Sequence, residues 1–396
     1  MIPLEDAQAI IDRTLSPLGL EREVVPVREA LGRTLAADQV SRLDLPPFDK
    51  SAMDGYALPE GEATRYQVRE TLPAGSVPSA RLEPGTAVKV MTGAPVPPGT
   101  ARVVRLELVR QEGEWIEVQK HDRDTHVCPQ GEDVRRGDLV LPAGTRITPA
   151  DVGNLIASGI VQLEVLRPIR LAVFSTGEEI TDDPAKLRPG MIMDSNGPML
   201  AALARAWGIE VTVHSRVGDD RQKTAEAIRA AFQRADLVVL SGGVSAGDFD
   251  FVGLAMADAG LSLHFQSVAI KPGKPTTYAS AGNRAAFGLP GNPVAVYLTF
   301  HLFVLRATAR LAGLPWPVRV LQLPLAEEFR RRNAERLEYR PCRLGDDGRL
   351  LPLEFHGTAH LAALRDADGL FAVPRDCQWI GAGERVDFLP IGKLMQ

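Results

Sequence analysis

The feature that most constrains the fold is a regular alternation of apolar, strand-like runs with helical patterns after residue 168. The strand-like runs are RLAVF, IEVTVHSRV, DLVVL, LHFQSVAI and AAFGL, and the helical patterns lie near 197–207, 220–234, 251–259 and 293–311. Asn292 and Pro293 suit the start of the last helix, where an Asn oxygen can cap free N–H groups, and Gly313 suits its end. This alternation predicts a parallel sheet covered by helices on both faces.

The remainder of the chain has a different character. Residues 4–15 and 25–38 have helical patterns, whereas residues 46–134 contain short β-type runs separated by Gly and Pro clusters. Turn-then-helix character returns after Gly137, so the β-rich segment is expected to be an insertion. Short strands with a GDDG turn follow residue 317. We therefore expect an α/β and β multidomain chain made of an elongated helical or extended arm (1–44 and 137–167), an inserted β-rich domain (45–136), the α/β domain (168–316) and a C-terminal β domain (317–396).

Charge and composition exclude several classes of protein. The formal net charge is −5 and the pI about 5.9, which gives no basic footprint for nucleic acid. The sequence contains neither the long uninterrupted apolar run of a spanning helix nor a signal-peptide pattern at its N-terminus, so a cytoplasmic protein without a membrane partner is expected. The three cysteines are too far apart for a zinc-ligand pattern.

Glycine, hydroxyl and carboxylate residues gather where the predicted strands end. SGGVSAGDFD (241–250) follows DLVVL directly, and STGEEI (175–180) follows RLAVF. Ligands of open α/β sheets bind at the carboxyl ends of the strands, where Gly permits close approach and helix N-termini attract phosphate. A Gly-rich connector and a helix-capping segment are the alternative interpretations of these two motifs.

Two further segments follow strands in the same way. KPGKP (271–275) follows LHFQSVAI, and its two lysines can hold an oxyanion; a solvated basic turn is the alternative. LPGNP (289–293) places a helix N-terminus at the same edge, although it can equally be a rigid loop and cap. These motifs together indicate an enzyme that handles an anionic, phosphate-bearing small molecule.

The β-rich segment contributes its own well-defined loops. They are PPFDKSAMDGYAL (46–58), VMTGAPVPPGT (90–100) and QGEDVRRGD (130–138). Proline brackets and the Met-Asp-Gly sequence favour loops that present Asp49, Asp54 and Thr92, and ordinary turns are the alternative.

Taken together and in this order, these motifs resemble the molybdopterin molybdenumtransferase family, of the MoeA and gephyrin C-terminal type, over the whole chain. The resemblance implies insertion of molybdate into adenylylated molybdopterin with release of AMP, assisted by a divalent cation such as Mg²⁺. It also implies a homodimer joined through the elongated domain, in which the α/β domain of one subunit faces the β-rich domain of the other. Other molybdenum-cofactor biosynthesis proteins and recipient molybdoenzymes are further expected partners.

The same resemblance assigns roles to individual residues by motif position. The expected catalytic residues are Asp54, Thr92, Glu179, Asp250, Lys271 and Lys274, with Glu179 and Asp250 as metal ligands. The expected substrate-binding residues are Asp133, Asp219, Ser241, Gly242, Gly243, Ser245, Pro290, Asn292 and Pro293. Carboxylates suit a hard cation, and the lysines suit the molybdate dianion.

The chain departs from the family pattern at Lys50, where Asn is common and where the charge beside Asp54 is expected to change, and at HGTAHL (356–361), where a QGSG-like stretch is typical. Asp133 and Asp219 are the weaker assignments because each adjoins a second carboxylate, Glu132 or Asp220. Two other functions remain open: a molybdopterin adenylyltransferase, and a non-catalytic dimeric scaffold of gephyrin type.

Overall fold

The structure is a computed structural model that describes residues 1–120, 123–243, 251–357 and 359–391. The chain forms two compact units. One comprises residues 1–21 and 167–396, and the other comprises residues 22–166. Each unit has hydrophobic cores of its own.

A six-stranded sheet forms the centre of the first unit, in the order β17-β14-β18-β22-β21-β19. The strands are β14 (Arg170–Thr176), β17 (Glu210–Val217), β18 (Leu237–Ser241), β19 (Ser262–Phe265), β21 (Thr277–Ala281) and β22 (Arg284–Leu289). The first four strands in the sheet order are parallel, as predicted. The prediction missed β21, which is antiparallel to β22 and to β19 and makes the sheet mixed.

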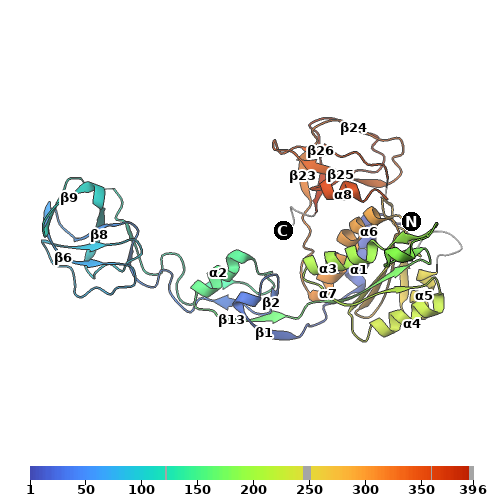
Figure 1. The fold of residues 1–396 in the computed structure, drawn as a ribbon, viewed down its shortest axis with the longest axis horizontal. Helices are drawn as coiled ribbons and strands as arrows, with labels where there is room; N and C mark the ends of the chain where they lie inside the picture. Colours follow the sequence, from blue (N-terminus) through green and yellow to red (C-terminus); the bar gives the residue numbers. More distant parts are fainter. Residues whose placement is uncertain (121–122, 244–250, 358, 392–396) are drawn as a thin grey trace. The chain divides into compact units, whose positions relative to one another are not determined.

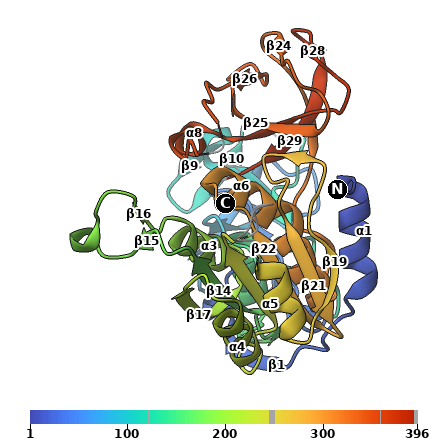
Figure 2. The ribbon, with the colours of Figure 1, turned by 90° about the vertical axis from the view of Figure 1, so that its right-hand side faces the viewer.

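Alternation along the central strands explains why both faces are covered. On β14 and β18, Leu171 and Leu237 belong to one core, and Ala172 and Val238 belong to another. Successive side chains of a strand point to opposite faces, so each strand supplies both cores. The helices are α3 (Asn196–Ala206), α4 (Arg221–Ala231), α5 (Val252–Asp258), α6 (Pro293–Thr299) and α7 (Leu305–Ala312). Figures 1 and 2 show α4 and α5 together on one side of the sheet and α6 on the other.

The predicted long helix forms as α6, a π-helical turn at Phe300–Val304, and α7, and it ends at Gly313 with φ 72°. Asn292 occupies the N-cap position but makes no side-chain capping hydrogen bond, which corrects the expected role of its oxygen. The run Pro293–Ala312 is long and apolar enough to cross a membrane, with a mean hydropathy of 1.3, but 78% of it is buried inside the fold. Burial of this extent is typical of a core helix.

The first helix, α1 (Leu4–Thr14), packs in the first unit instead of in the predicted arm. Ala7 and Ile11 lie in the same core as Phe303 and Leu311, and Arg306 forms a bidentate ion pair with Asp12. The helical pattern of residues 4–15 is therefore confirmed, but its placement with residues 22–44 is wrong. The sequence pattern of an amphipathic helix predicts that one face is apolar, but it does not predict which surface packs against that face.

The C-terminal part of the first unit is a β domain, as expected. Its sheet has the order β20-β25-β27-β29-β23, with β26 paired to β25 through the predicted turn at residues 345–348. The elements are β20 (Ile270–Lys271), β23 (Leu321–Pro324), β24 (Phe329–Arg330), β25 (Leu337–Leu344), β26 (Leu350–Pro352), α8 (Ala362–Asp366), β27 (Gly369–Val373), β28 (Trp379–Ile380) and β29 (Arg385–Pro390). Strand β20 comes from the KPGKP segment, so this segment links the two sheets.

The second unit contains a small sheet, β1-β13-β2, and a six-stranded sheet, β8-β5-β7-β6-β10-β9. The small sheet consists of β1 (Arg22–Pro26), β2 (Thr34–Leu35) and β13 (Gln162–Leu166), with helix α2 (Pro149–Ala157) beside it. The predicted helix over 25–38 is wrong: Pro26 lacks the N–H that a helix interior needs, and Val24 and Val25 pair with β13 instead.

The larger sheet of the second unit is inserted between two paired strands. The chain leaves the small domain after β3 (Gln39–Val40) and returns through β12 (Leu139–Leu141), which pairs with β3. This topology confirms the predicted insertion. The inserted strands are β4 (Lys50–Ser51), β5 (Gly55–Pro59), β6 (Arg65–Leu72), β7 (Thr86–Val90), β8 (Thr100–Arg105), β9 (Val109–Glu112), β10 (Trp115–Val118) and β11 (Val127–Cys128).

Candidate functional site

The loops after the parallel strands converge on one cleft of about 750 Å³ in the first unit. Of the predicted site residues, the cleft is lined by Glu179, Asp219, Ser241, Gly242, Gly243, Pro290, Asn292 and Pro293. They follow β14, β17, β18 and β22, whose carboxyl ends lie at the same edge because the strands are parallel. The expected convergence of the strand-end loops is therefore found in the structure.

Glycine is required where β18 turns into the cleft. Gly242 and Gly243 have φ values of 98° and 64°, which favour glycine, and a Cβ on Gly242 would lie 2.6 Å from the carbonyl oxygen of Thr176. The loop therefore runs against the end of β14, and its backbone stays accessible to a ligand.

Asn196, which the sequence analysis did not select, ties three of these loops together. Its Nδ2 donates to Ser241 Oγ at 2.9 Å and to the carbonyl oxygen of Gly291 at 2.7 Å. Its Oδ1 and the hydroxyl of Ser175 are buried without a hydrogen-bond partner, and both residues line the cleft. The signal that could have found Asn196 is its position in MIMDSNGPML, directly before a helix.

Two helix N-termini reach the same cleft. Ser195 and Asn196 begin α3, and Asn292 and Pro293 begin α6, and all four residues line it. Free N–H groups at such termini favour anions, phosphate in particular.

The described side chains that line the cleft include three carboxylates, Glu179, Asp194 and Asp219, and no Lys, Arg or His. Burial raises the pKa of Asp219, and the neighbouring carboxylates of Glu179 and Glu178 raise it further, against a hydrogen bond from the Glu178 backbone that lowers it. The carboxylates are thus arranged at a cost in mutual repulsion. A bound cation would relieve that repulsion.

The structure separates the two adjacent carboxylates at 219 and 220. Asp219 lines the cleft, whereas Asp220 caps α4 by accepting a hydrogen bond from the backbone N–H of Lys223 at 2.9 Å. That capping bond is the largest cause of the lowered pKa of Asp220. In the same way, Glu179 lines the cleft and Glu178 does not.

The two predicted lysines, Lys271 and Lys274, do not line the cleft. Strand β19 runs in the same direction as β22, since both are antiparallel to β21, so KPGKP begins at the expected edge. Only Pro275 of this segment lines the cleft. Lys271 forms an ion pair with Glu338 at 3.1 Å, and Lys274 is exposed. The expectation that both ammonium groups reach the cleft directly is not met in the described structure.

Asp54 and Thr92 meet in the second unit. Asp54 Oδ1 accepts hydrogen bonds from the backbone N–H and the hydroxyl of Thr92, both at 2.7 Å. These two bonds are the main causes of the lowered pKa of Asp54, and Lys89 contributes. Lys50 lies in β4, which pairs with β11.

The position of Asp54 depends on the glycine that follows it. Gly55 lies in β5 between β7 and β8, and an added Cβ would be 2.3 Å from the carbonyl oxygen of Val104. Asp133 lies in the second unit too, with an exposed side chain and its backbone N–H bonded to the carbonyl oxygen of Leu45.

Ser245 and Asp250 lie outside the described residues. Among the residues that are described, no three His, Cys, Asp or Glu side chains form a group that could hold a metal ion. The HGTAHL departure contributes Ala359 to the cleft wall.

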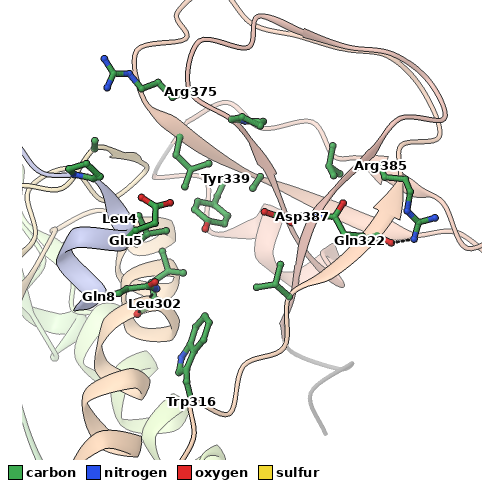
Figure 3. A pocket seen from close by; sticks show the side chains of 17 residues that line it. Leu4, Glu5, Gln8, Leu302, Trp316, Gln322, Tyr339, Arg375, Arg385 and Asp387 are labelled. Carbon is green, nitrogen blue, oxygen red and sulfur yellow. Dashed lines mark hydrogen bonds between the residues drawn. The ribbon is translucent and has the colours of Figure 1, made fainter. Parts of the chain in front are cut away.

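A second cavity of about 520 Å³ is lined by residues of α1, by Leu302 of the π-helical turn and by residues of the C-terminal sheet. Figure 3 shows Trp316 and Tyr339 among its lining side chains, with the guanidinium groups of Arg375 and Arg385 pointing away from them. Burial raises the pKa of the Tyr339 hydroxyl, and Asp387 and Glu5 raise it further. None of the predicted site residues lines this cavity.

Comparisons with known proteins bear on the whole chain. Family models described as the MoeA N-terminal region (domain I and II), a probable molybdopterin binding domain and the MoeA C-terminal region (domain IV) match residues 2–159, 172–310 and 322–391. A protein of Staphylococcus epidermidis named molybdopterin molybdenumtransferase is 32% identical over 91% of this chain and 89% of its own. The chain belongs to the molybdopterin molybdenumtransferase (MoeA) family.

Other relatives agree with this MoeA assignment. Proteins with the same name from Nostoc and Staphylococcus aureus are 38% and 30% identical, over 74% and 98% of this chain and 70% and 95% of their own. Two crystal structures of a molybdopterin biosynthesis MoeA protein from Pyrococcus horikoshii, both 28% identical, match with TM-scores of 0.83 and 0.76. They cover 99% and 98% of this chain, and 100% and 99% of theirs. The resemblance inferred from the motifs is therefore confirmed. All the lining residues of the cleft except Ala359 lie within the segment matched to the molybdopterin binding domain.

Proposed function

We propose that this chain is a molybdopterin molybdenumtransferase, which inserts molybdate into adenylylated molybdopterin and releases AMP. The observation that carries the proposal is the convergence of four strand-end loops on one cleft, in a chain whose relatives have this name. The cleft offers two helix N-termini and a glycine backbone for the phosphates of the substrate.

A divalent cation, Mg²⁺ in the simplest case, fits the donor set of the cleft. Glu179 and Asp219 both line the cleft, without a Lys, Arg or His among the described lining residues. Burial raises the pKa of Asp219, and the carboxylates of Glu179 and Glu178 raise it further. Asp250, the second predicted ligand, lies outside the described residues. When bound, the cation would neutralise pyrophosphate oxygens and the departing AMP.

Molybdate is a dianion, so the carboxylates of the cleft would repel it without added positive charge. Lys271 and Lys274 remain our proposed source of that charge, since they flank the turn whose last residue, Pro275, lines the cleft. Ammonium groups donate up to three hydrogen bonds to oxyanions.

Asp54, Thr92 and Asp133 belong to the second unit, and we propose that they complete the cleft of the other subunit in a homodimer. The support is the motif resemblance together with the Asp54–Thr92 contact, which holds a carboxylate and a hydroxyl in one place. We also propose that the protein is cytoplasmic and that its partners include other molybdenum-cofactor biosynthesis proteins and recipient molybdoenzymes.

The test is to incubate the protein with adenylylated molybdopterin, molybdate and Mg²⁺ and to follow AMP by chromatography. We expect AMP release that depends on both molybdate and Mg²⁺, with a parallel reaction in tungstate to measure oxyanion preference. Asp250→Ala is expected to abolish release without unfolding the protein, and mixed Asp54→Ala and Asp250→Ala subunits are expected to regain part of it.

Two other outcomes would replace the proposal. Pyrophosphate release from ATP and molybdopterin would identify an adenylyltransferase. Capture of a protein partner by a chain without any molybdate-dependent turnover would identify a scaffold.

A further inference from the structure

Glu338 on β25 is an unusual residue in this fold. It is 2% exposed, and among the residues that the structure describes it is the one Asp, Glu, Lys or Arg that is fully buried. Removing a carboxylate from water is unfavourable unless cations or hydrogen-bond donors replace the water. The partners of Glu338 should therefore explain why it is there.

Arg331 satisfies one of the two carboxylate oxygens. Its Nη1 lies 3.3 Å from Glu338 Oε2, and its side chain is 6% exposed. The same guanidinium donates to the carbonyl oxygens of Cys377 at 2.7 Å, Arg336 at 2.9 Å and Pro374. Arg331 is thus a fixed internal part of the C-terminal domain, and it is sufficient to balance the charge of Glu338.

The other oxygen of Glu338 faces two more cations. Lys271 Nζ lies 3.1 Å and Arg340 Nη1 3.6 Å from Oε1, and their side chains are 45% and 23% exposed. Three cations around one carboxylate leave a surplus of two positive charges. Stability of the fold does not require this surplus, because Arg331 alone pairs the buried charge; a bound anion would use it.

The backbone places Lys271 beside Glu338 as well. Strands β20 and β25 pair in parallel, with Lys271 opposite Glu338, and Leu337 donates its N–H to the carbonyl oxygen of Ala269 at 3.2 Å. The turn that follows is closed by the hydrogen bond from Val268 N–H to the carbonyl oxygen of Lys274 at 3.0 Å. Its far end, Pro275, lines the cleft. Lys271 is thus fastened at one end of a short closed segment whose other end borders the cleft.

We propose that Glu338 is a positioning residue, which acts through Lys271. Its Oε1 accepts one hydrogen bond from the Lys271 ammonium and leaves the other two N–H groups directed to solvent and to an oxyanion. The inference rests on the proposed function only in its second half, the use of Lys271 to hold molybdate. The restraint of Lys271 by Glu338 is a separate claim with its own measurement.

The restraint is tested without any turnover. Trace acetylation of lysines, read by mass spectrometry, compares Lys271 with Lys274, which lies on the same peptide and serves as an internal reference. Lys271 is expected to be protected in the wild-type protein, and Glu338→Gln is expected to raise its relative labelling roughly fivefold. Glu338→Asp keeps the charge that Arg331 needs but shortens the reach to Lys271, so its labelling should be intermediate. If Glu338→Gln does not fold, Glu338→Asp takes its place in the measurement. Unchanged relative labelling in a folded variant overturns the proposal.

The catalytic consequence is tested by a double-mutant cycle on AMP release. Glu338→Gln is expected to lower kcat by about tenfold or more, since a misplaced catalytic group is costly, with little change in KM for adenylylated molybdopterin. In a Lys271→Met background, Glu338→Gln should have no further effect on kcat. With Lys271 intact, Glu338→Asp should retain more of the wild-type kcat than Glu338→Gln does. Glu328→Gln is the matched control, because Glu328 pairs with Arg330 at 3.0 Å on the surface of the same domain, and its kcat should stay at the wild-type value.

The two claims fail in different ways. A wild-type protein that releases no AMP refutes the proposed function and leaves the labelling result to decide the restraint. Equal losses of kcat in both backgrounds show that Glu338 acts elsewhere than through Lys271, and normal kcat in Glu338→Gln shows that the restraint has no catalytic use.

Discussion

Asp54 and Asp219 are carboxylates of the same kind in two parts of the molecule, and their surroundings act on them in opposite directions. Asp54 in the inserted β-rich domain receives two hydrogen bonds from Thr92, which lower its pKa. Asp219 in the α/β domain is partly desolvated and lies near Glu178 and Glu179, and its pKa is raised. The Asp54 carboxylate accepts two hydrogen bonds at 2.7 Å, whereas Asp219 accepts one at 3.4 Å, from the backbone N–H of Glu178.

The difference indicates that the two carboxylates suit different roles. A carboxylate held by an N–H and a hydroxyl is fixed in position and stays ionised, which suits orientation of a substrate or of a neighbouring group. A carboxylate crowded by others gains most when a cation arrives, which suits a metal ligand. The cleft is therefore incomplete by itself, and the Asp54–Thr92 pair is complete before any ligand binds.

Of these two carboxylates, Asp219 should have the larger effect on turnover when it is replaced. Asp219→Asn removes the charge that a cation would neutralise, and we expect Mg²⁺-dependent AMP release to fall by about 100-fold or more, because a bound metal contributes several kcal/mol to such reactions. The matched control is Asp220→Asn, the adjacent residue, where asparagine can still cap α4 and turnover should be retained. Equal losses in the two variants would place the effect in the loop as a whole, and no loss in either would remove Asp219 from the site.

Replacing Asp54 should have a smaller effect on the same reaction. Asp54→Asn keeps an oxygen that can accept from Thr92 but loses the negative charge, and we expect turnover to fall about tenfold, as for other residues that support a site. Equal mixing with Asp219→Asn subunits should restore part of the activity if the two units act across a dimer. Mixtures that stay at the level of the single variants after verified subunit exchange would contradict that arrangement.

The sequence predicts the cleft well because its residues follow strands. Parallel strands bring their carboxyl ends to one edge, so Glu179, Ser241 and Pro290 meet although they are far apart along the chain. The same reasoning does not apply to Asp54 and Thr92: the family resemblance assigned both to the site, but their contact with each other was not predicted.

Long-range packing explains what the sequence does not predict. The sequence pattern of α1 does not predict that the helix packs against α7. Similarly, nothing in KPGKP indicates that Lys271 pairs with the buried Glu338 of the C-terminal domain. Asn196 was missed for a related reason. Its importance comes from contacts with Ser241 and Gly291, which only the assembled loops bring within reach.

The two carboxylates should also differ in how they affect stability with pH. Between the lowered pKa of Asp54 and its ordinary value of 3.8, the unfolded chain binds more protons, so this residue stabilises the fold as pH rises. Between 3.8 and the raised pKa of Asp219, the folded chain binds more protons, so this residue destabilises the fold as pH rises.

At neutral pH without metal, Asp219→Asn is therefore expected to raise Tm slightly and Asp54→Asn to lower it. Calorimetric scans at several pH values, with and without Mg²⁺, measure both. Mg²⁺ should raise the wild-type Tm more than that of Asp219→Asn. Changes of the same sign in the two variants would contradict the contrast.

Removing a single hydrogen bond at Asp54 should have the smallest effect. Thr92→Ala deletes the hydroxyl donor but keeps the backbone N–H, so the pKa of Asp54 should move only part of the way back toward 3.8. Turnover should fall about threefold, the value of one modest hydrogen bond. Thr92→Ser, which restores the hydroxyl, should recover it, and NMR titration of the Asp54 carboxyl carbon would follow the pKa directly. If Thr92→Ala lowered turnover as much as Asp54→Asn, the hydroxyl of Thr92 would have to contact the substrate itself, and its role would no longer be the support of Asp54.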